Sequence, residues 1–267
     1  MNNKTGTIGV FDSGVGGLTV FHRIAERLPG AAIIYLGDTA RVPYGTKSAE
    51  TVVRYARGCA GILLDRGISA LVVACNTASA YALDTLRQEI AVPVLGVIEP
   101  GAQRAVQATR NGKVGVIGTA GTIHSGAYQK TIRELAPAIR VFAKPCPFFV
   151  PLVEEGWTDG DVPRRVVRTY LEELLDENID TLVLGCTHYP LLKPVISEVA
   201  GADVALVDSA EATAHALVDL LHHESWERGT ASKPCHRFLV TDAPENFARV
   251  SRRFLGYDVT DVEWVDF

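Results

Sequence analysis

The chain has 267 residues, of which 47% are hydrophobic and 21% are charged, and its formal net charge is −5. This length allows two ordinary domains or one large one, and the acidic balance argues against a nucleic-acid partner, which requires a basic face. No apolar run approaches the ~20 residues that cross a bilayer, and the N-terminal residues lack the apolar segment of a secretory signal. We therefore expect no membrane partner and a cytoplasmic location.

Apolar runs alternate with helical patterns through the first hundred residues. Strands are predicted at 7–11, 32–36, 70–74 and 94–97, and helices at 18–28, 49–66 and 78–89. After Pro100 a similar order begins again. It predicts strands at 114–117, 140–143, 181–185 and 204–207, a loop at 145–156, and helices up to 108, after 119, at 161–177 and after Pro190. The remaining tail predicts a helix, a strand at 236–242, a further helix and a strand at 261–267, and we expect this tail to rejoin the first half.

Three strands of the first half align with three of the second. The apolar run that begins at residue 8 aligns with the run that begins at 114, an offset of 106 residues. The run at 70 aligns with the run at 181, an offset of 111 residues, and the run at 93 aligns with the run at 203, an offset of 110 residues. This pattern indicates an internal duplication with a period too long for a solenoid. Near-continuous apolar strands between helices are typical of parallel sheets covered on both faces.

We therefore predict an α/β fold of two pseudo-symmetric lobes, with mainly parallel sheets flanked by helices and an active site in the cleft between the lobes. The expected first lobe is discontinuous and combines residues 1–98 with 209–267, and the second lobe comprises residues 99–208.

Five cysteines occur at irregular spacing, at positions 59, 75, 146, 186 and 235. An odd number without a secretory signal argues against a disulfide framework, and the absence of a CxxC pair gives no support to a structural zinc site. Cys59 falls on an apolar helix face and is assigned to the core. Cys146, between two prolines, and Cys235, near the C-terminal strand, belong to no polar constellation and are assigned structural roles.

Cys75 and Cys186 differ from the other cysteines, because each ends an apolar strand at matching positions of the duplication. Ligands of parallel sheets bind just beyond the carboxyl ends of the strands. The polar residues at such ends are Asp12, Ser13, Asp38, Cys75, Asn76, Thr77, Thr119, Cys186, Thr187 and His188. Two thiols that face one ligand from opposite sides suit a two-base reaction at one carbon.

In that reaction a thiolate removes a proton from Cα of an amino acid, and the opposite thiol delivers one. Each cysteine precedes a predicted helix N-terminus, where the helix dipole and free N–H groups favour the thiolate. The same N–H groups, with the side chains of Asn76, Thr77 and Thr187, suit a carboxylate. Asp12 is the expected helper of Cys75, and His188 that of Cys186.

Several of these residues also have simpler interpretations. Asp12 and Asp38 are candidates for helix caps, and His188 for a satisfied loop histidine. The glycines at 14, 16 and 17 resemble part of a dinucleotide fingerprint, but Thr19 stands where a third glycine is required. We instead expect these glycines to let the backbone pass close to Asp12.

Four motifs together carry a resemblance that covers nearly the whole chain: FDSGVGGLTV from residue 11, LGDTARVPYGTKS from 36, VVACNTASA from 72 and LGCTHYPLL from 184. They resemble the cofactor-independent glutamate racemases of bacterial cell-wall synthesis, in the aspartate/glutamate racemase family. The resemblance implies racemisation of glutamate without cofactor or metal, supply of D-glutamate for peptidoglycan, and a homodimer. Related aspartate racemases typically carry Glu after Cys-Thr, so His188 favours glutamate.

Residue by residue, the resemblance implies that Cys75 is the thiol for the D-enantiomer and Cys186 the thiol for the L-enantiomer, with assisting acidic residues at Asp12 and Glu154. It implies substrate contacts at Asp12, Ser13, Tyr44, Gly45, Asn76, Thr77, Thr187 and His188. Without it, Tyr44 and Gly45 read as a turn after Pro43, and Glu154 as the end of an exposed helix.

Three other functions remain open from the residues alone. One is racemisation of aspartate or another amino acid. A second is a non-catalytic protein with two lobes that close on an amino acid. A third is a hydrolase with Cys186 as nucleophile and His188 as base, which leaves Cys75 unexplained.

Overall fold

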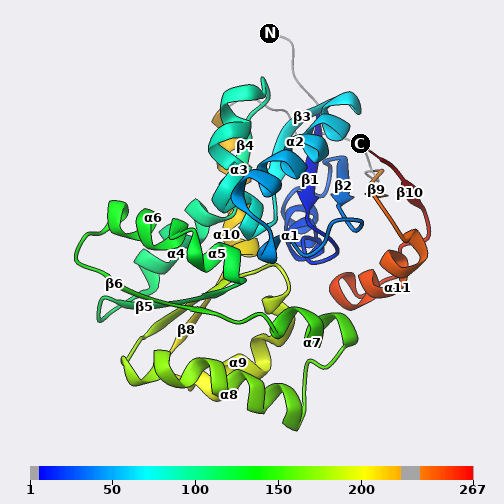
Figure 1. Cartoon of the computed structure of the whole chain (residues 1–267). Coiled ribbons are helices and arrows are strands. Elements are labelled where there is room, and N and C mark those ends of the chain that lie inside the picture. Colours follow the sequence, from blue (N-terminus) through cyan, green and yellow to red (C-terminus); the bar gives the residue numbers. More distant parts are fainter. Residues whose placement is uncertain (1–5, 224–234, 267) are drawn as a thin grey trace. The chain divides into compact units, whose positions relative to one another are not determined.

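The computed structural model describes residues 6–223 and 235–266 (Figure 1). The chain forms two compact units, one of residues 1–97 with 210–267 and the other of residues 98–209. Every strand pairing recorded in the two sheets is parallel. The predicted α/β class, with parallel sheets flanked by helices, is confirmed. Among the described residues, no helix is long and apolar enough to span a bilayer.

The first unit is built on a six-stranded sheet in the order β10-β9-β2-β1-β3-β4. Its strands are β1 (Thr7–Asp12), β2 (Ile33–Gly37), β3 (Ile68–Val73), β4 (Val94–Gly96), β9 (Arg237–Val240) and β10 (Val262–Trp264). Its helices are α1 (Leu18–Arg27), α2 (Ala49–Asp65), α3 (Asn76–Glu89), α10 (Ser209–His223) and α11 (Pro244–Leu255), with a 3₁₀ turn η1 (Tyr44–Thr46). Right-handed crossovers place α2 and α3 together and α1 and α11 together, on opposite faces of the sheet.

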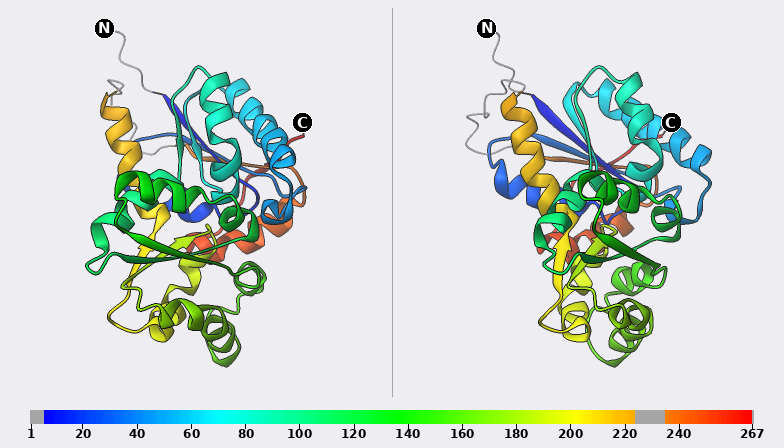
Figure 2. Two further views of the ribbon diagram at one scale, coloured as in Figure 1. Left: turned by 60° about the vertical axis from the view of Figure 1, so that its left-hand side comes forward. Right: turned by 90° about the vertical axis from the view of Figure 1, so that its left-hand side faces the viewer.

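The second unit is built on a four-stranded sheet in the order β6-β5-β7-β8. Its strands are β5 (Lys113–Gly118), β6 (Arg140–Pro145), β7 (Thr181–Gly185) and β8 (Ala205–Asp208). Its helices are α4 (Ile98–Ala108), α5 (Ala120–His124), α6 (Ala127–Leu135), α7 (Phe149–Glu155), α8 (Asp161–Asp176) and α9 (Lys193–Ala200), with a 3₁₀ turn η2 (Tyr189–Leu192). Within this unit α4 packs with α6 and α8 with α9, on the two faces of the sheet (Figures 1 and 2).

One predicted loop, at 145–156, is wrong, because α7 occupies most of it. The three prolines in the run PCPFFVP suggest a segment that cannot form a helix. Pro151, however, is the third residue of α7, where the backbone N–H has no partner within the helix in any case. The helix after Cys75 also begins two residues earlier than predicted, at Asn76.

The two sheets repeat one arrangement, since β2-β1-β3-β4 and β6-β5-β7-β8 have the same order. In the first sheet Ile8 lies opposite Ala70, and in the second Val114 lies opposite Thr181. These registers reproduce the offsets of 106 and 111 that the sequence gives. For the third pair the registers give 112 rather than 110, because Leu71 faces Val94 and Leu182 faces Leu206. An error of two residues keeps every side chain on its proper face.

The loop between β1 and α1 returns to touch the strand it has just left. A Cβ atom at Gly17 would lie 2.4 Å from Cβ of Asp12 and 3.0 Å from the hydroxyl of Tyr35. Gly17 has an ordinary helical backbone, with φ of −61°, so lack of space and not torsional strain requires glycine. The prediction that glycines let the backbone pass close to Asp12 is confirmed.

We expect Gly17→Ala to lower the free energy of unfolding by about 1–3 kcal/mol, because the added methyl group overpacks a buried contact. Gly61→Ala is the matched control: a Cβ at Gly61, inside α2, meets nothing within 4 Å. That change should raise the free energy of unfolding by about 0.5–1 kcal/mol. Urea unfolding checks both values, and equal effects of the two substitutions would contradict this account.

Candidate active site

Cys75 lies between the end of β3 and the start of α3. It is the N-cap residue of α3, and its Sγ accepts a hydrogen bond from the backbone N–H of Ala78 at 3.4 Å. Its Sγ also lies 3.7 Å from Oγ of Ser13. The side chain is buried, with 5% of its surface exposed. Free N–H groups and the helix dipole at this position stabilise a thiolate.

Ser13 reaches this thiol, and Asp12 lies at the same edge of the sheet, because β1 is the neighbour of β3. Asp12 is the last residue of β1, is fully buried, and accepts a hydrogen bond from the N–H of Gly14 at 3.0 Å. It therefore does not cap α1, whose N-cap residue is Gly17. The structure thus brings a carboxylate, a hydroxyl and a thiol to one edge of one sheet.

Tyr35 belongs to the same group of residues but is not recognisable in the sequence. It lies inside the apolar strand β2, and its hydroxyl donates to the carbonyl of Gly14 at 2.8 Å. Burial, followed by the nearby Asp12 and Cys75, raises the pKa of Tyr35 well above its usual range. Tyr35 is thus a neutral donor that fixes the loop after Asp12.

Tyr44 and Gly45 form the buried start of η1. The Tyr44 hydroxyl donates to Oδ2 of Asp38 at 2.5 Å, and the other oxygen of Asp38 accepts from Thr241 at 2.7 Å and from Arg41 at 2.9 Å. Asp38 therefore holds the loop in place instead of capping a helix. The Tyr44 hydroxyl is committed to this contact, which leaves the backbone around Gly45 as the part of the loop suited to a ligand.

Asn76 and Thr77 follow Cys75 directly as the first residues of α3, and both are buried. In the second unit Thr119 is the residue directly after β5, and Ser13 is the residue directly after β1 in the first unit. The two residues are 106 positions apart, which is the offset between β1 and β5. Thr119 is the N-cap residue of α5, and its Oγ1 accepts from the N–H of Thr122 at 3.3 Å. Its hydroxyl is therefore used locally.

Cys186 ends β7 and is the first member of a polar chain in the second unit. Its Sγ lies 3.9 Å from Nδ1 of His188, and Nε2 of His188 lies 3.0 Å from Oε1 of Glu154 in α7. Cys186, Thr187 and His188 are all buried, whereas the side chain of Glu154 is 38% exposed. His188 therefore has a partner at each ring nitrogen, and Glu154 is paired with it.

The electrostatics of this chain keep His188 protonated. Burial lowers the pKa of His188, but hydrogen bonds with Cys186 and Glu154 outweigh it and raise the pKa to about 10. A protonated imidazole beside Cys186 places a positive charge next to its sulfur. The position equivalent to Asp12 in the second unit is Gly118, so the carboxylate near this thiol comes from Glu154 in α7, through His188.

The other cysteines do not join these groups. All five cysteines are free. Cys59 and Cys146 are buried, and burial raises the pKa of each thiol, which makes both unreactive. The core assignment of Cys59 is confirmed. Cys235 is exposed and does not belong to the core.

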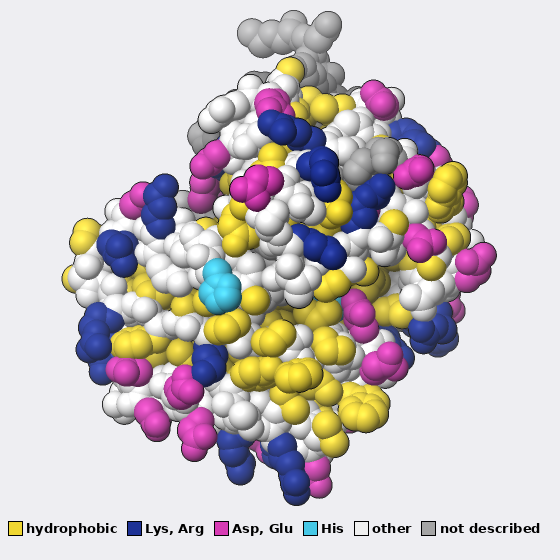
Figure 3. Space-filling view, in the orientation of Figure 1, with side chains coloured by type: hydrophobic (Ala, Val, Ile, Leu, Met, Phe, Trp, Pro, Cys, Tyr) yellow, Lys and Arg dark blue, Asp and Glu magenta, His cyan; other side chains and the backbone are white. Residues whose placement is uncertain are grey.

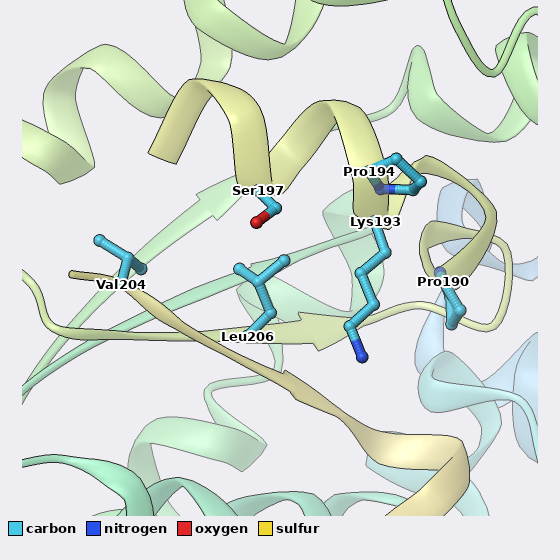
Figure 4. A pocket seen from close by; sticks show the side chains of 6 residues that line it. All are labelled: Pro190, Lys193, Pro194, Ser197, Val204 and Leu206. Carbon is cyan, nitrogen blue, oxygen red and sulfur yellow. The ribbon is translucent and has the colours of Figure 1, made fainter. Parts of the chain in front are cut away.

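Two of the pockets in the second unit contain no predicted site residue. One, of about 490 Å³, lies beside α9 and β8 and is lined by Pro190, Lys193, Pro194, Ser197, Val204 and Leu206 (Figure 4). The other, of about 230 Å³, lies beside α7, where apolar side chains gather on the surface (Figure 3). Phe148 and Trp157 line this second pocket and are 66% and 55% exposed.

Solved structures with this fold define its class. The chain superimposes on the glutamate racemase isoform RacE1 from Bacillus anthracis with a TM-score of 0.94 and 43% identity, covering 98% of this chain and 97% of that one. It superimposes on the glutamate racemase of Francisella tularensis, solved in complex with D-glutamate, with a TM-score of 0.91 and 40% identity, covering 98% of each chain. The α/β architecture is thus that of amino-acid racemases.

Sequence comparison makes the assignment more specific. The Asp/Glu/hydantoin racemase family matches residues 8–217. The chain is 56% identical to the glutamate racemase of Geobacter metallireducens over 255 residues, which are 96% of this chain and 94% of that protein. The chain belongs to the Asp/Glu/hydantoin racemase family and is an enzyme of the isomerase class. The family resemblance predicted from the four motifs is confirmed.

We expect Glu154→Gln to lower the pKa of His188 below about 10, because it removes one of the two partners that raise it. Titration of the imidazole by nuclear magnetic resonance measures this shift. Glu155→Gln, an exposed neighbour on the same helix, is the control and should leave the pKa unchanged. A parental His188 pKa in Glu154→Gln would contradict the role of the contact.

The same contact links stability to pH. The pKa of His188 is raised above its ordinary value of 6.5, so its protonation stabilises the folded state fully below pH 6.5, and this contribution is lost as the pH rises to about 10. Glu154→Gln should therefore reduce the free energy of unfolding more near pH 6 than above pH 10. Urea unfolding at the two pH values checks the sign.

Proposed function

We propose that the protein is a glutamate racemase, which interconverts L- and D-glutamate without a cofactor and supplies D-glutamate for peptidoglycan synthesis. The observation that carries the proposal is the pair of buried cysteines at equivalent strand ends of a duplicated fold, each with its own acid–base partners. The names of the relatives support glutamate as the substrate.

In the proposed mechanism the two thiols act on opposite faces of Cα. With D-glutamate, the Cys75 thiolate takes the Cα proton, the C–H electron pair stays on carbon, and the Cys186 thiol protonates the other face. With L-glutamate the roles reverse. Each turnover leaves one cysteine newly protonated and the other newly deprotonated. Both must return to their starting protonation states before the next turnover in the same direction.

Each thiol has a different group to hold its charge. Cys75 has the N–H of Ala78 and the hydroxyl of Ser13 beside its sulfur, and Asp12 is the proposed acceptor of its proton. Cys186 has the imidazolium of His188, which Glu154 holds in place. Because His188 remains protonated at neutral pH, it serves as a donor to the thiolate and not as a base.

The remaining predicted residues bind the substrate in this proposal. Asn76 and Thr77 lie at the N-terminus of α3, where backbone N–H groups attract a carboxylate. Thr187 and His188 offer donors from the second unit, and the Tyr44–Gly45 turn offers backbone groups. Ser13 and Thr119 complete the contacts at the ends of β1 and β5.

The proposed role also implies surroundings for the enzyme. D-Glutamate for cell-wall precursors is needed in the cytoplasm, which is where we place the enzyme. The family resemblance supports a homodimer, and no nucleic acid or membrane takes part in the reaction.

We expect Cys75→Ala and Cys186→Ala each to lower kcat/KM for racemisation by roughly 10²- to 10⁴-fold, because each removes a group that transfers the proton. Chiral chromatography measures the rate from either enantiomer. Cys235→Ala, at an exposed free cysteine, is the control and should keep the parental rate. Parental activity in both site variants would overturn the proposal.

Aspartate is tested beside glutamate in the same assay. Faster racemisation of aspartate would contradict the proposed substrate. Binding of glutamate without any racemisation would instead indicate a non-catalytic binding protein.

A further inference from the structure

The carbonyl group two residues before each cysteine accepts a serine hydroxyl. In the first unit this carbonyl belongs to Val73, and in the second it belongs to Leu184. The two positions are equivalent, because they differ by the offset of 111 that relates Cys75 to Cys186. The two serines come from different parts of the chain, so the duplication alone does not explain the shared contact.

In the first unit the serine is Ser79, on the first turn of α3. Its Oγ donates to the carbonyl of Val73 at 2.9 Å and accepts from the N–H of Val97 at 3.3 Å. Val97 follows β4, the neighbour of β3. Ser79 is buried. It therefore ties the end of the cysteine strand to the end of the adjacent strand.

In the second unit the serine is Ser209, the residue after β8, which is the neighbour of β7. Its Oγ donates to the carbonyl of Leu184 at 3.4 Å, and its side chain is hydrogen-bonded to the buried hydroxyl of Tyr128. The Tyr128 ring also packs on the residue before the cysteine: a Cβ at Gly185 would lie 3.1 Å from Cε2 of Tyr128. Tyr128 and Ser209 thus hold the end of β7 from two directions.

We propose that Ser79 positions Cys75, and that Ser209 with Tyr128 positions Cys186, so that each thiol is aligned for proton transfer by its own hydroxyl contact. This inference rests on the proposed racemase function. None of the three residues needs to touch the substrate. They act on the backbone that carries the thiol, and a displacement of about 1 Å at a reacting group costs up to ~10²-fold in rate.

The chemistry of racemisation allows an experiment to distinguish a misplaced thiol from a general loss of structure. The two enantiomers have equal free energy, so any variant lowers kcat/KM equally in both directions. The primary isotope effect of deuterium at Cα behaves differently, because it rises only where removal of that proton becomes slower relative to the other steps. A misplaced Cys186 slows proton removal from L-glutamate, and a misplaced Cys75 slows removal from D-glutamate.

The experiment measures isotope effects on kcat/KM with each deuterated enantiomer. Ser209→Ala and Tyr128→Phe should lower kcat/KM about tenfold, raise the isotope effect with L-glutamate and lower it with D-glutamate. Ser79→Ala should give the reverse pattern. Ser209→Thr retains a hydroxyl and should recover much of the parental isotope effect.

The matched control is Ser251→Ala. Ser251 is fully buried in α11, and its hydroxyl donates to the carbonyl of Ala248 at 2.8 Å, so it reproduces the type of contact away from either cysteine. It should leave both isotope effects unchanged. Parental isotope effects in Ser79→Ala and Ser209→Ala, or changes in the same direction for both, would overturn the proposal.

A second readout does not depend on activity. Amide hydrogen exchange followed by mass spectrometry should accelerate around Cys75 in Ser79→Ala and around Cys186 in Ser209→Ala, but not the converse. If the parental protein fails to racemise glutamate, the proposed function is wrong, and this exchange pattern still tests the positioning. Unchanged exchange at both cysteines would overturn the positioning itself.

Discussion

A thiol that must lose and regain a proton needs an environment that tolerates its charge inside a protein. Burial alone raises the pKa of a cysteine, as it does for Cys59 in the core of the first unit. Cys75 stands at the junction of a strand and a helix, where the N–H of Ala78 points at its sulfur. The arrangement of parallel strands, each followed by a helix, provides such junctions at one edge of each sheet.

The duplication supplies two of these junctions, and divergence makes them unlike. Strand order and the register of the two central pairs are the same in the two units. The carboxylate of Asp12, however, is replaced by Gly118 in the second unit, where Glu154 acts through His188 instead. A racemase has substrates of equal free energy on its two sides, but nothing requires the two sides to use the same groups. Here a serine hydroxyl lies beside one thiol, and a histidine imidazole lies beside the other.

The sequence was informative wherever local pattern decides structure. Uninterrupted apolar runs are visible as buried parallel strands, and aligning the two halves matched β1 with β5 and β3 with β7 to the residue. The short strands β4 and β8 were misaligned by two positions, because so few residues leave several alignments equally good. The helix α7 was missed because its proline is tolerated only at a particular position in the first turn.

Contacts between segments that are distant in the sequence could not be predicted, for a different reason. The partner of Asp38, Thr241, is separated from it by 203 residues and carries no motif. Tyr35 looks like any aromatic residue in a buried strand until its hydroxyl is seen to bond to Gly14. The approach of Glu154 to His188 depends on α7, and so the family resemblance, not the residue pattern, pointed to Glu154.

The central claim is that two separate thiols work on opposite faces of one carbon. Incubation of pure L-glutamate in deuterium oxide, stopped at low conversion, tests it most directly. Two thiols predict that the D-glutamate formed carries deuterium at Cα while the remaining L-glutamate keeps its protium, because the proton delivered comes from a different group than the one that was removed. Protium transferred intact to the D-product, or equal deuterium in both enantiomers from the start, would contradict the account.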